Sequence, residues 1–120
     1  MNERDFKALL RKKIKPHAYI QSMSSYASNG TPDLWISGAK DLWIEAKVES
    51  PDKRNIKPKL SALQAKWIKD RTLEGRNVWT IVGLSTKEAI IYRGLDCFET
   101  TNNRQSVDEI IKIILDEYIL

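Results

Sequence analysis

The segment DLWIEAKV, residues 41–48, constrains the fold of this chain more than any other stretch. Apolar side chains at every second position alternate with larger or charged ones: Leu42, Ile44, Ala46 and Val48 against Trp43, Glu45 and Lys47. A period of two predicts a β-strand, because successive side chains of a strand point to opposite faces. Glu45 and Lys47 are therefore expected on one face, together with Trp43.

A second carboxylate, Asp33, precedes this strand. Pro32 presets its own backbone angle and biases the residue before it towards an extended conformation, so Asp33 is expected to begin a short strand over residues 34–36. Residues 37–40 predict a tight connection and an antiparallel return that brings Glu45 opposite Asp33. Two converging carboxylates repel each other, and the arrangement is costly unless a cation lies between them.

Further residues extend this pattern along the chain. A Gly-x-Pro-Asp segment, an apolar strand ending in Glu-x-Lys, and a helix opening with Ser-x-x-Gln follow in order: Gly30, Pro32, Asp33, Glu45, Lys47, Ser61, Gln64 and Gly75. The series resembles the PD-(D/E)XK nuclease superfamily, and most closely the virus-type replication-repair nuclease (VRR-NUC) domain and its Holliday-junction resolvase relatives. The matching stretch runs from Gly30 to Gly83, close to half of the chain.

The resemblance implies a DNA endonuclease that hydrolyses phosphodiester bonds with Mg²⁺, for which Mn²⁺ substitutes. Four residues would take part in catalysis: Asp33, Glu45, Lys47 and Gln64. Four would bind the metal: Asp33, Glu45 and Glu3 through their carboxylates, and Ala46 through its backbone carbonyl. Lys47 would orient or deprotonate the attacking water, or stabilise the phosphate, and the sequence leaves these roles open.

Each of these residues also has an ordinary structural explanation. Asp33 belongs to a residue type that is common in turns, and Glu45 and Lys47 both fit the solvated outer face of an edge strand. Trp43 on that same face indicates a covered surface instead. Glu3 is equally an exposed acid in the first turn of a helix, and Gln64 completes a Ser-x-x-Gln capping box.

Composition narrows the class of protein. A chain of 120 residues with 42% apolar content predicts one globular domain. It contains no run of eighteen apolar residues and no apolar leader at its start. A membrane span is therefore not expected, and an intracellular location is expected. The single Cys97 excludes an internal disulfide, and with the single His17 it cannot build a zinc site. Cys97 is expected to be a small buried hydrophobe.

The charge distribution favours a polyanionic partner. Residues 1–80 hold 16 Lys and Arg against 9 Asp and Glu, whereas residues 81–120 hold 4 against 7. The basic part contains the candidate carboxylates, so phosphate would be attracted there. Eight residues are expected to contact DNA: Lys53, Arg54, Lys57 and Lys59 of a polar loop, Lys12 and Lys13 of the first helix, and Ser28 and Asn29. Any single one of these lysines is better explained as a solvated surface residue, and it is the cluster Lys53, Arg54, Lys57 and Lys59 that favours a phosphate-contacting loop.

The remaining patterns predict an alternation of helices and strands. Apolar residues at helical spacing predict a helix over residues 3–14, and capping boxes predict helices that begin at Ser61 and Ser106. Strands are expected within 17–27 and at 34–36, 42–48, 77–82 and 88–92, with a loop at 49–59. This order predicts an α/β fold, and the resemblance implies a restriction-endonuclease-like core: a mixed four- to five-stranded sheet flanked by helices on both faces.

The last helix carries more apolar residues than a single buried stripe requires: Ile110, Ile111, Ile113, Ile114, Leu115, Tyr118, Ile119 and Leu120. Part of this surface is expected to face the core, and the rest would form a two-fold interface or be buried deeply. A homodimer would place two sites for symmetric cuts in branched DNA, as resolvases make in recombination and repair. Small stand-alone VRR-NUC domains are typical of bacteriophages, so the resemblance implies a phage or prophage source.

Three other functions remain open from the sequence. One is a nuclease of the same fold that is non-specific or directed at flaps and ends. Another is a catalytically silent DNA-binding module, which would have no use for converging carboxylates. The third is an RNA-directed nuclease, a class that usually works through a His, and His17 lies far from the motif in sequence. The basic surface by itself does not distinguish DNA from RNA.

Overall fold

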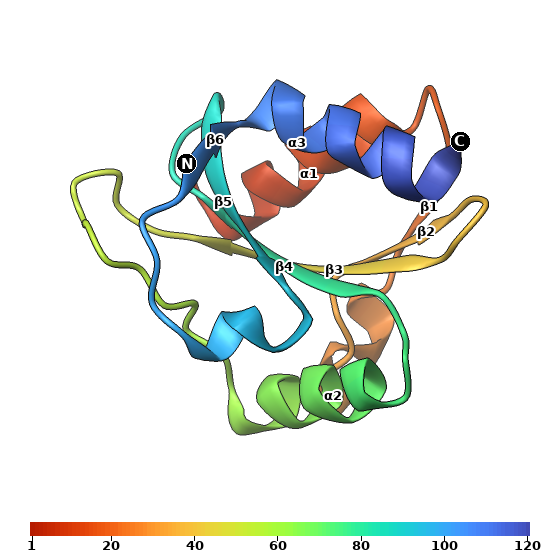
Figure 1. Cartoon of the computed structure of the whole chain (residues 1–120), viewed down its shortest axis with the longest axis horizontal. Coiled ribbons are helices and arrows are strands. Elements are labelled where there is room, and N and C mark those ends of the chain that lie inside the picture. The colour runs from red at the N-terminus through yellow and green to blue at the C-terminus, as the bar shows by residue number, and fades with distance from the viewer.

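A six-stranded sheet divides two helical layers in the computed structural model, which describes residues 1–120 except for the side chain of Ala27 (Figure 1). The strands lie side by side in chain order: β1 Tyr19–Ser22, β2 Leu34–Ser37, β3 Leu42–Val48, β4 Val78–Gly83, β5 Glu88–Arg93 and β6 Arg104–Ser106. Only β3 and β4 are parallel, and the other neighbours are antiparallel. A parallel pair needs a long crossover, which residues 49–77 supply.

Three α-helices cover the sheet: α1 Glu3–Ile14, α2 Ala62–Leu73 and α3 Val107–Ile114. Helices α1 and α3 lie on one face and α2 on the other (Figure 1). Short 3₁₀ segments precede β2 (η1, Ser24–Asn29) and follow β5 (η2, Gly94–Phe98), and a π-helical turn, η3 Leu115–Ile119, extends α3. No helix in the part of the chain that the structure describes is long and apolar enough to cross a membrane.

Two hydrophobic clusters hold these layers together, one on each side of the sheet. The larger joins α1 and α3 to the sheet through buried residues that include Phe6, Leu10, Ile44, Ala46 and Ile110. The smaller lies beneath α2 and η2 and includes Ile56, Ile68 and Cys97. Cys97 is fully buried, as expected for a small hydrophobe. Burial raises the pKa of its thiol, which keeps the group neutral.

The predicted fold class is confirmed, with one more strand than expected. The mixed sheet and the helices on both faces are present, but the sheet has six strands rather than four or five. The additional strand β6 has three residues and pairs with β5 through Glu88 and Ser106. A segment of three residues is too short to show a period of two, so its sequence carried no strand signal.

The apolar surface of the last helix belongs mainly to the protein core. Ile110, Ile111, Ile114 and Tyr118 are buried in the larger cluster, and Ile113, Leu115 and Ile119 pack against it. Leu120 alone of the eight residues is largely exposed, at 88%. Deep burial therefore accounts for the composition of this helix, and the helix leaves little apolar surface for a two-fold interface.

Candidate active site

The candidate site lies where β2 and β3 separate. The two strands pair at Leu34 and Ile44, and the next pair in the same register would be Asp33 and Glu45. At this point a side chain takes the place of a backbone acceptor in the hydrogen-bond ladder. The Asp33 Oδ2 accepts a hydrogen bond of 2.8 Å from the backbone N–H of Ala46. The Asp33 carbonyl still accepts from the N–H of Met23, which keeps the β1 side of the strand fixed. The predicted approach of Glu45 to Asp33 is thus built into the strand register.

The backbone carbonyl of Ala46 faces the same gap between the strands. Trp43 and Glu49 donate their backbone N–H groups towards β4, to the carbonyls of Asn77 and Gly83. Residues at even positions of β3 therefore direct their N–H and C=O groups to the β2 side, because both groups of one residue point to the same edge of a strand. The Ala46 N–H on Asp33 confirms this direction. Its carbonyl is consequently available beside the Asp33 carboxylate.

Glu45 is a buried carboxyl group on the α2 face of the sheet, only 2% exposed. Burial, reinforced by the charge of Asp33 and a hydrogen bond with it, raises the pKa of Glu45 to about 9, although Lys47 acts in the opposite direction. A carboxyl group that is protonated near neutral pH next to a second carboxylate is a common feature of functional sites. The solvated edge-strand explanation for Glu45 is therefore wrong.

Lysine side chains lie against these carboxylates. The Lys47 Nζ is 3.8 Å from Glu45 Oε2 and 3.7 Å from Glu3 Oε1, so Glu3 reaches the site from the first turn of α1. Lys7 donates a hydrogen bond of 3.4 Å to Asp33 Oδ1. Lys7 was not identified as a site residue from the sequence. Lys7 lies four residues after Glu3, so helical spacing alone places the two side chains on the same face of α1.

Gln64 serves both as a helix cap and as a neighbour of Glu45. Its backbone N–H donates to Ser61 Oγ at 3.1 Å, and its Oε1 accepts from the Ser61 N–H at 3.0 Å. Its Nε2 donates to Glu45 Oε2 at 3.3 Å. The capping box and the position in the site are therefore not alternatives, because the box fixes the carboxamide that reaches the carboxyl group.

Gly30 determines how closely α2 approaches the strands. Its φ of +80° lies in the left-handed region that favours glycine. A Cβ at this position would lie 2.3 Å from the carbonyl oxygen of Leu63 and 2.9 Å from the backbone nitrogen of Gln64. The glycine of the Gly-x-Pro-Asp motif thus lets the first turn of α2 pack against the start of β2, which places Gln64 beside Glu45.

The donor set fits a small divalent cation. Asp33, Glu45 and the Ala46 carbonyl offer hard oxygen atoms around one gap, which are ligands that Mg²⁺ prefers. No group of three or more His, Cys, Asp or Glu side chains among those described is arranged around a single metal position. Mg²⁺ commonly uses one or two carboxylates and keeps several waters, so two carboxylates and one carbonyl suffice.

The loop at residues 49–59, which carries Lys53, Arg54, Lys57 and Lys59 and is called the basic loop below, lies next to the site and is bonded to the rest of the protein. Lys57 and Lys59 line a cavity of about 100 Å³ together with Glu3 and Lys47. Within the loop, Lys53 and Lys59 form ion pairs with Glu49, at 3.2 and 3.9 Å, while Arg54 is exposed.

Contacts from the C-terminal third of the chain hold this loop in place. Arg104 donates hydrogen bonds to the carbonyls of Pro51 and Lys53, and the Tyr92 hydroxyl donates to the carbonyl of Ile56. Ile56 also exchanges backbone hydrogen bonds with Thr101. The loop therefore has a defined position relative to Glu3 and Lys47.

The other four residues expected at DNA divide into two pairs, of which only Lys12 and Lys13 lie away from the carboxylates. Lys12 and Lys13 belong to the last turn of α1, at the opposite end from Glu3, and Lys13 pairs with Asp108 of α3 at 2.7 Å. Ser28 and Asn29 are exposed at the end of η1, directly before Gly30. The structure thus brings Ser28 and Asn29 near the start of the motif, but it does not bring the two lysines there.

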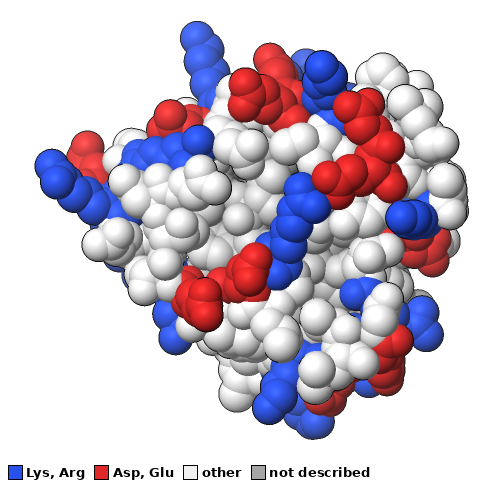
Figure 2. Space-filling model, viewed as in Figure 1, with Lys and Arg blue, Asp and Glu red and all other residues white. Residues whose placement is uncertain are grey.

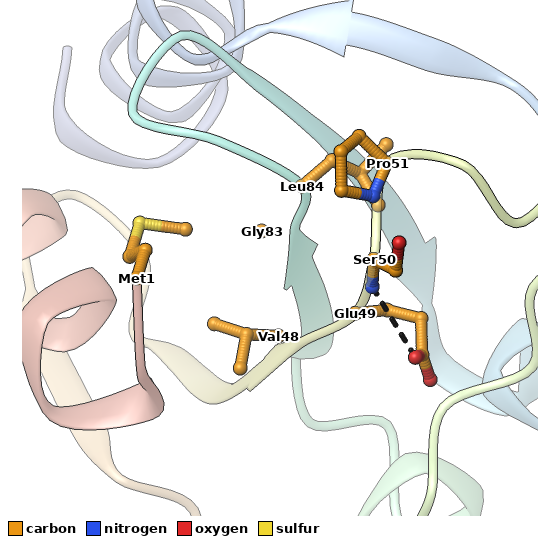
Figure 3. Close-up of a pocket in the computed structure, with 7 residues that line it drawn as sticks. All are labelled: Met1, Val48, Glu49, Ser50, Pro51, Gly83 and Leu84. Carbon is orange, nitrogen blue, oxygen red and sulfur yellow. Dashed lines mark hydrogen bonds between the residues drawn. The ribbon is translucent and has the colours of Figure 1, made fainter.

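A cavity of about 380 Å³ with a mixed polar and apolar lining continues from the end of β3 (Figure 3). Met1, Val48, Pro51 and Leu84 surround it, and Glu49 lies at its rim with its carboxylate accepting the Ser50 N–H at 3.2 Å. On the face shown in Figure 2, basic and acidic side chains are interspersed. The excess positive charge of residues 1–80 is thus not gathered into one band on that face.

Comparison with known proteins shows a similarity of fold and no similarity of sequence family. No family model matches the sequence, and no curated protein matches it. Among solved structures, the chain is similar to Hjc, a Holliday junction resolvase from the archaeal hyperthermophile Archaeoglobus fulgidus, with a TM-score of 0.53. The match covers 75% of this chain and 73% of that chain at 15% sequence identity. The shared fold supports a restriction-endonuclease-like core for this chain.

Proposed function

We propose that the protein is a Mg²⁺-dependent DNA endonuclease of the PD-(D/E)XK type, closest to VRR-NUC domains, in which Mn²⁺ substitutes for Mg²⁺. Its site would comprise Asp33, Glu45, the Ala46 carbonyl and Lys47, with Gln64 and Glu3 beside them. The observation that carries the proposal is the approach of two carboxyl groups at a strand separation, one of them 2% exposed with a pKa of about 9. Such an arrangement costs stability, and a cation between the groups would offset that cost.

The residues of the proposed site would have different roles in hydrolysis. Asp33 is oriented by the Ala46 N–H, and Glu45 by the carboxamide of Gln64. Lys47 lies between Glu45 and Glu3, where its ammonium group reaches an attacking water or a phosphate oxygen. Bound Mg²⁺ would neutralise charge on the phosphate and make a water more acidic. Positioned groups and neutralised charge are the main requirements of phosphodiester hydrolysis.

The finer proposal is that branched DNA, including the Holliday junction, is the preferred substrate and that the protein acts as a homodimer in DNA recombination or repair. Its support is the fold shared with Hjc, which is a Holliday junction resolvase. A chain of 120 residues contacts only a short stretch of DNA, and two copies would place two sites for paired cuts.

Cleavage of four matched DNA substrates tests the proposal. A four-way junction, a flap, a linear duplex and a single strand are incubated with Mg²⁺, with Mn²⁺ or with EDTA. Wild-type protein is compared with Asp33→Ala and Lys47→Ala at the same concentration. Paired symmetric cuts in the junction that disappear with EDTA and in both variants would support a dimeric resolvase.

The other outcomes separate the alternatives. Metal-dependent cutting of flaps, ends or duplexes without a junction preference would retain the nuclease and reject the resolvase. DNA binding without cleavage under any condition would reject the catalytic proposal and favour a silent DNA-binding module. That second candidate is supported by Lys7 and Lys47, which lie 3.4 Å from Asp33 and 3.8 Å from Glu45 and partly compensate the carboxyl groups without a metal.

A further inference from the structure

A groove with basic walls lies on the opposite side of Asp33 from the basic loop. It has a volume of about 270 Å³, and α1 contributes three cationic side chains to it: Arg4, Lys7 and Arg11. Ser22 at the end of β1 and Ser24 at the start of η1 line the other side, with Leu34 between. We call these residues the α1 groove.

The three cations share a face because of their spacing on the helix. Arg4 and Lys7 are three residues apart, and Arg11 follows Lys7 by four, so all three project from one side of α1. Lys12 is the next residue after Arg11 and points about 100° away around the axis, as the 3.6-residue turn requires. Lys12 and Lys13 do not line the groove.

Lys7 pairs with Asp33, but the other two cations, Arg4 and Arg11, are only weakly engaged by acids of the protein. Arg4 lies 3.8 Å from the neighbouring Asp5, with both side chains exposed, which is a weak pair in water. Among the side chains that the structure describes, no carboxylate lies within 4.0 Å of the Arg11 guanidinium. Positive charge lining a concave surface without compensation attracts a polyanion.

The groove is joined directly to the candidate active site. Lys7 lines the groove and also contacts Asp33 Oδ1 at 3.4 Å. On the other side of the carboxylates, Lys57 and Lys59 line the cavity that contains Glu3 and Lys47. Basic side chains thus flank the carboxylates on two sides, which is the arrangement a phosphodiester chain crossing the site would need.

We propose that the α1 groove binds the phosphate backbone of one DNA strand where it leaves the carboxylates. Arg4 and Arg11 donate to phosphate oxygens, and the Ser24 hydroxyl, which accepts from the Ser22 hydroxyl at 3.3 Å, donates alongside them. Contacts of this kind fix the position of the strand without reading its sequence. The proposal rests on the proposed function for the nature of the ligand, and it replaces Lys12 and Lys13 as the DNA contacts of α1.

A matched pair of charge reversals tests this site. Arg11→Glu and Lys12→Glu change the net charge equally, at neighbouring exposed positions of the same helix. Binding of fluorescein-labelled single-stranded and duplex DNA is measured by anisotropy in EDTA, so that no cleavage occurs. We expect Arg11→Glu to weaken binding about tenfold or more and Lys12→Glu by less than about threefold. Arg11→Ala should reduce the slope of log K against log salt by about 0.7–0.9, corresponding to one phosphate contact.

Equal losses for Arg11→Glu and Lys12→Glu, or no loss for Arg11→Glu, would overturn the α1 groove. Thermal unfolding of both variants, expected to match wild type, excludes misfolding as the cause of a difference. Failure of this proposal is distinguishable from failure of the nuclease. Selective weakening by Arg11→Glu in a protein that never cleaves DNA would retain the groove and reject the nuclease. Cleavage with equal effects of the two reversals would retain the nuclease and reject the groove.

Discussion

The α2 side and the α1 side of the candidate site hold the same carboxylates in different ways. On the α2 side, Gln64 approaches Glu45 through a neutral amide whose position is fixed by a capping box and by the close contact at Gly30. On the α1 side, Glu3 and Lys7 reach the site with long charged side chains, 51% and 30% exposed. One side is held by backbone geometry and the other by charge.

Because the two sides are held differently, substitutions on the α2 side should affect stability, and substitutions on the α1 side should affect binding. Backbone contacts such as those at Gly30 cannot adjust without moving a helix, so changes there should appear first in the free energy of unfolding. Exposed ion pairs contribute little to stability, but they set the local potential that a metal ion or a phosphate encounters. Substitutions on the two sides should therefore give different signatures.

The largest expected effect is on catalysis at the carboxylates themselves. Asp33→Asn keeps the size of the side chain and its ability to accept from the Ala46 N–H, but removes the negative charge. Cleavage with Mg²⁺ should fall by about a thousandfold or more, because charge neutralisation at the phosphate is lost. Single-turnover rates measure this. Lys7→Ala, which changes charge on the α1 side, should reduce the rate far less. Equal losses in the two variants would contradict the view that Asp33 acts at the reacting phosphate and Lys7 does not.

Gly30→Ala should give the largest loss of stability. The added Cβ would lie 2.3 Å from the Leu63 carbonyl oxygen and would sit at a φ of +80°. The free energy of unfolding should decrease by about 3–4 kcal/mol. Gly75→Ala is the matched control, since its φ is +89° but nothing lies within 4 Å of the added atom, and only the backbone strain of about 1 kcal/mol should remain. Urea unfolding of both variants would show equal losses if the contact with α2 is unimportant.

Glu45→Gln should change the pH dependence of stability. The pKa of Glu45 is about 9 in the fold, against 4.5 for an ordinary glutamate. Between these pH values the unfolded chain has lost a proton that the folded chain retains, so wild-type stability decreases as pH rises from about 4.5 to about 9. Gln carries no such proton, and the variant should lose less stability between pH 5 and pH 8, by a few kcal/mol.

Urea unfolding in EDTA at the two pH values measures this difference, and other titrating groups cancel in the comparison with wild type. Parallel pH profiles for wild type and Glu45→Gln would contradict the buried, protonated Glu45. A loss that appears only below pH 4.5 would do so as well.

The smallest effect separates the two contacts of Gln64. Ser61→Ala removes the hydrogen bond that Ser61 Oγ accepts from the Gln64 backbone N–H. It should cost about 1 kcal/mol of stability with little change in cleavage. Gln64→Ala removes the other half of the box, the bond from the Ser61 N–H to Gln64 Oε1, together with the contact with Glu45, and should reduce cleavage in addition to a similar loss of stability. Chemical unfolding and initial cleavage rates of both variants, measured together, would show identical behaviour if Gln64 is only a cap.

Local patterns in the sequence predicted most of the fold and the approach of Glu45 to Asp33 at the candidate site. The alternation around Glu45 predicted β3, the Pro-Asp segment predicted the start of β2, and the short connection at residues 37–40 predicted the antiparallel return that places Asp33 opposite Glu45. All three rest on interactions between residues close in the chain. The capping box likewise predicted the start of α2, and the structure confirms it at Ser61 and Gln64.

What the sequence could not predict depends on how distant segments meet. Strand β6 has too few residues to show a period, and the attachment of the basic loop by Arg104 joins residues 51 positions or more apart. The choice of Arg11 rather than Lys12 for a groove depends on where β1 ends beside α1. Helical spacing gives the face of each residue, but not the neighbour that face will meet.

Mn²⁺ binding tests the central claim, a cation site between Asp33 and Glu45, most directly. Wild type, Asp33→Asn and Asp41→Asn are titrated with Mn²⁺ at pH 7.5, with free metal followed by its electron paramagnetic resonance. Asp41 is an exposed carboxylate just before β3 and serves as the control. The predicted result is saturable binding by wild type and Asp41→Asn that is lost in Asp33→Asn. Equal binding by all three proteins, or no binding by any, would contradict a metal site at these carboxylates.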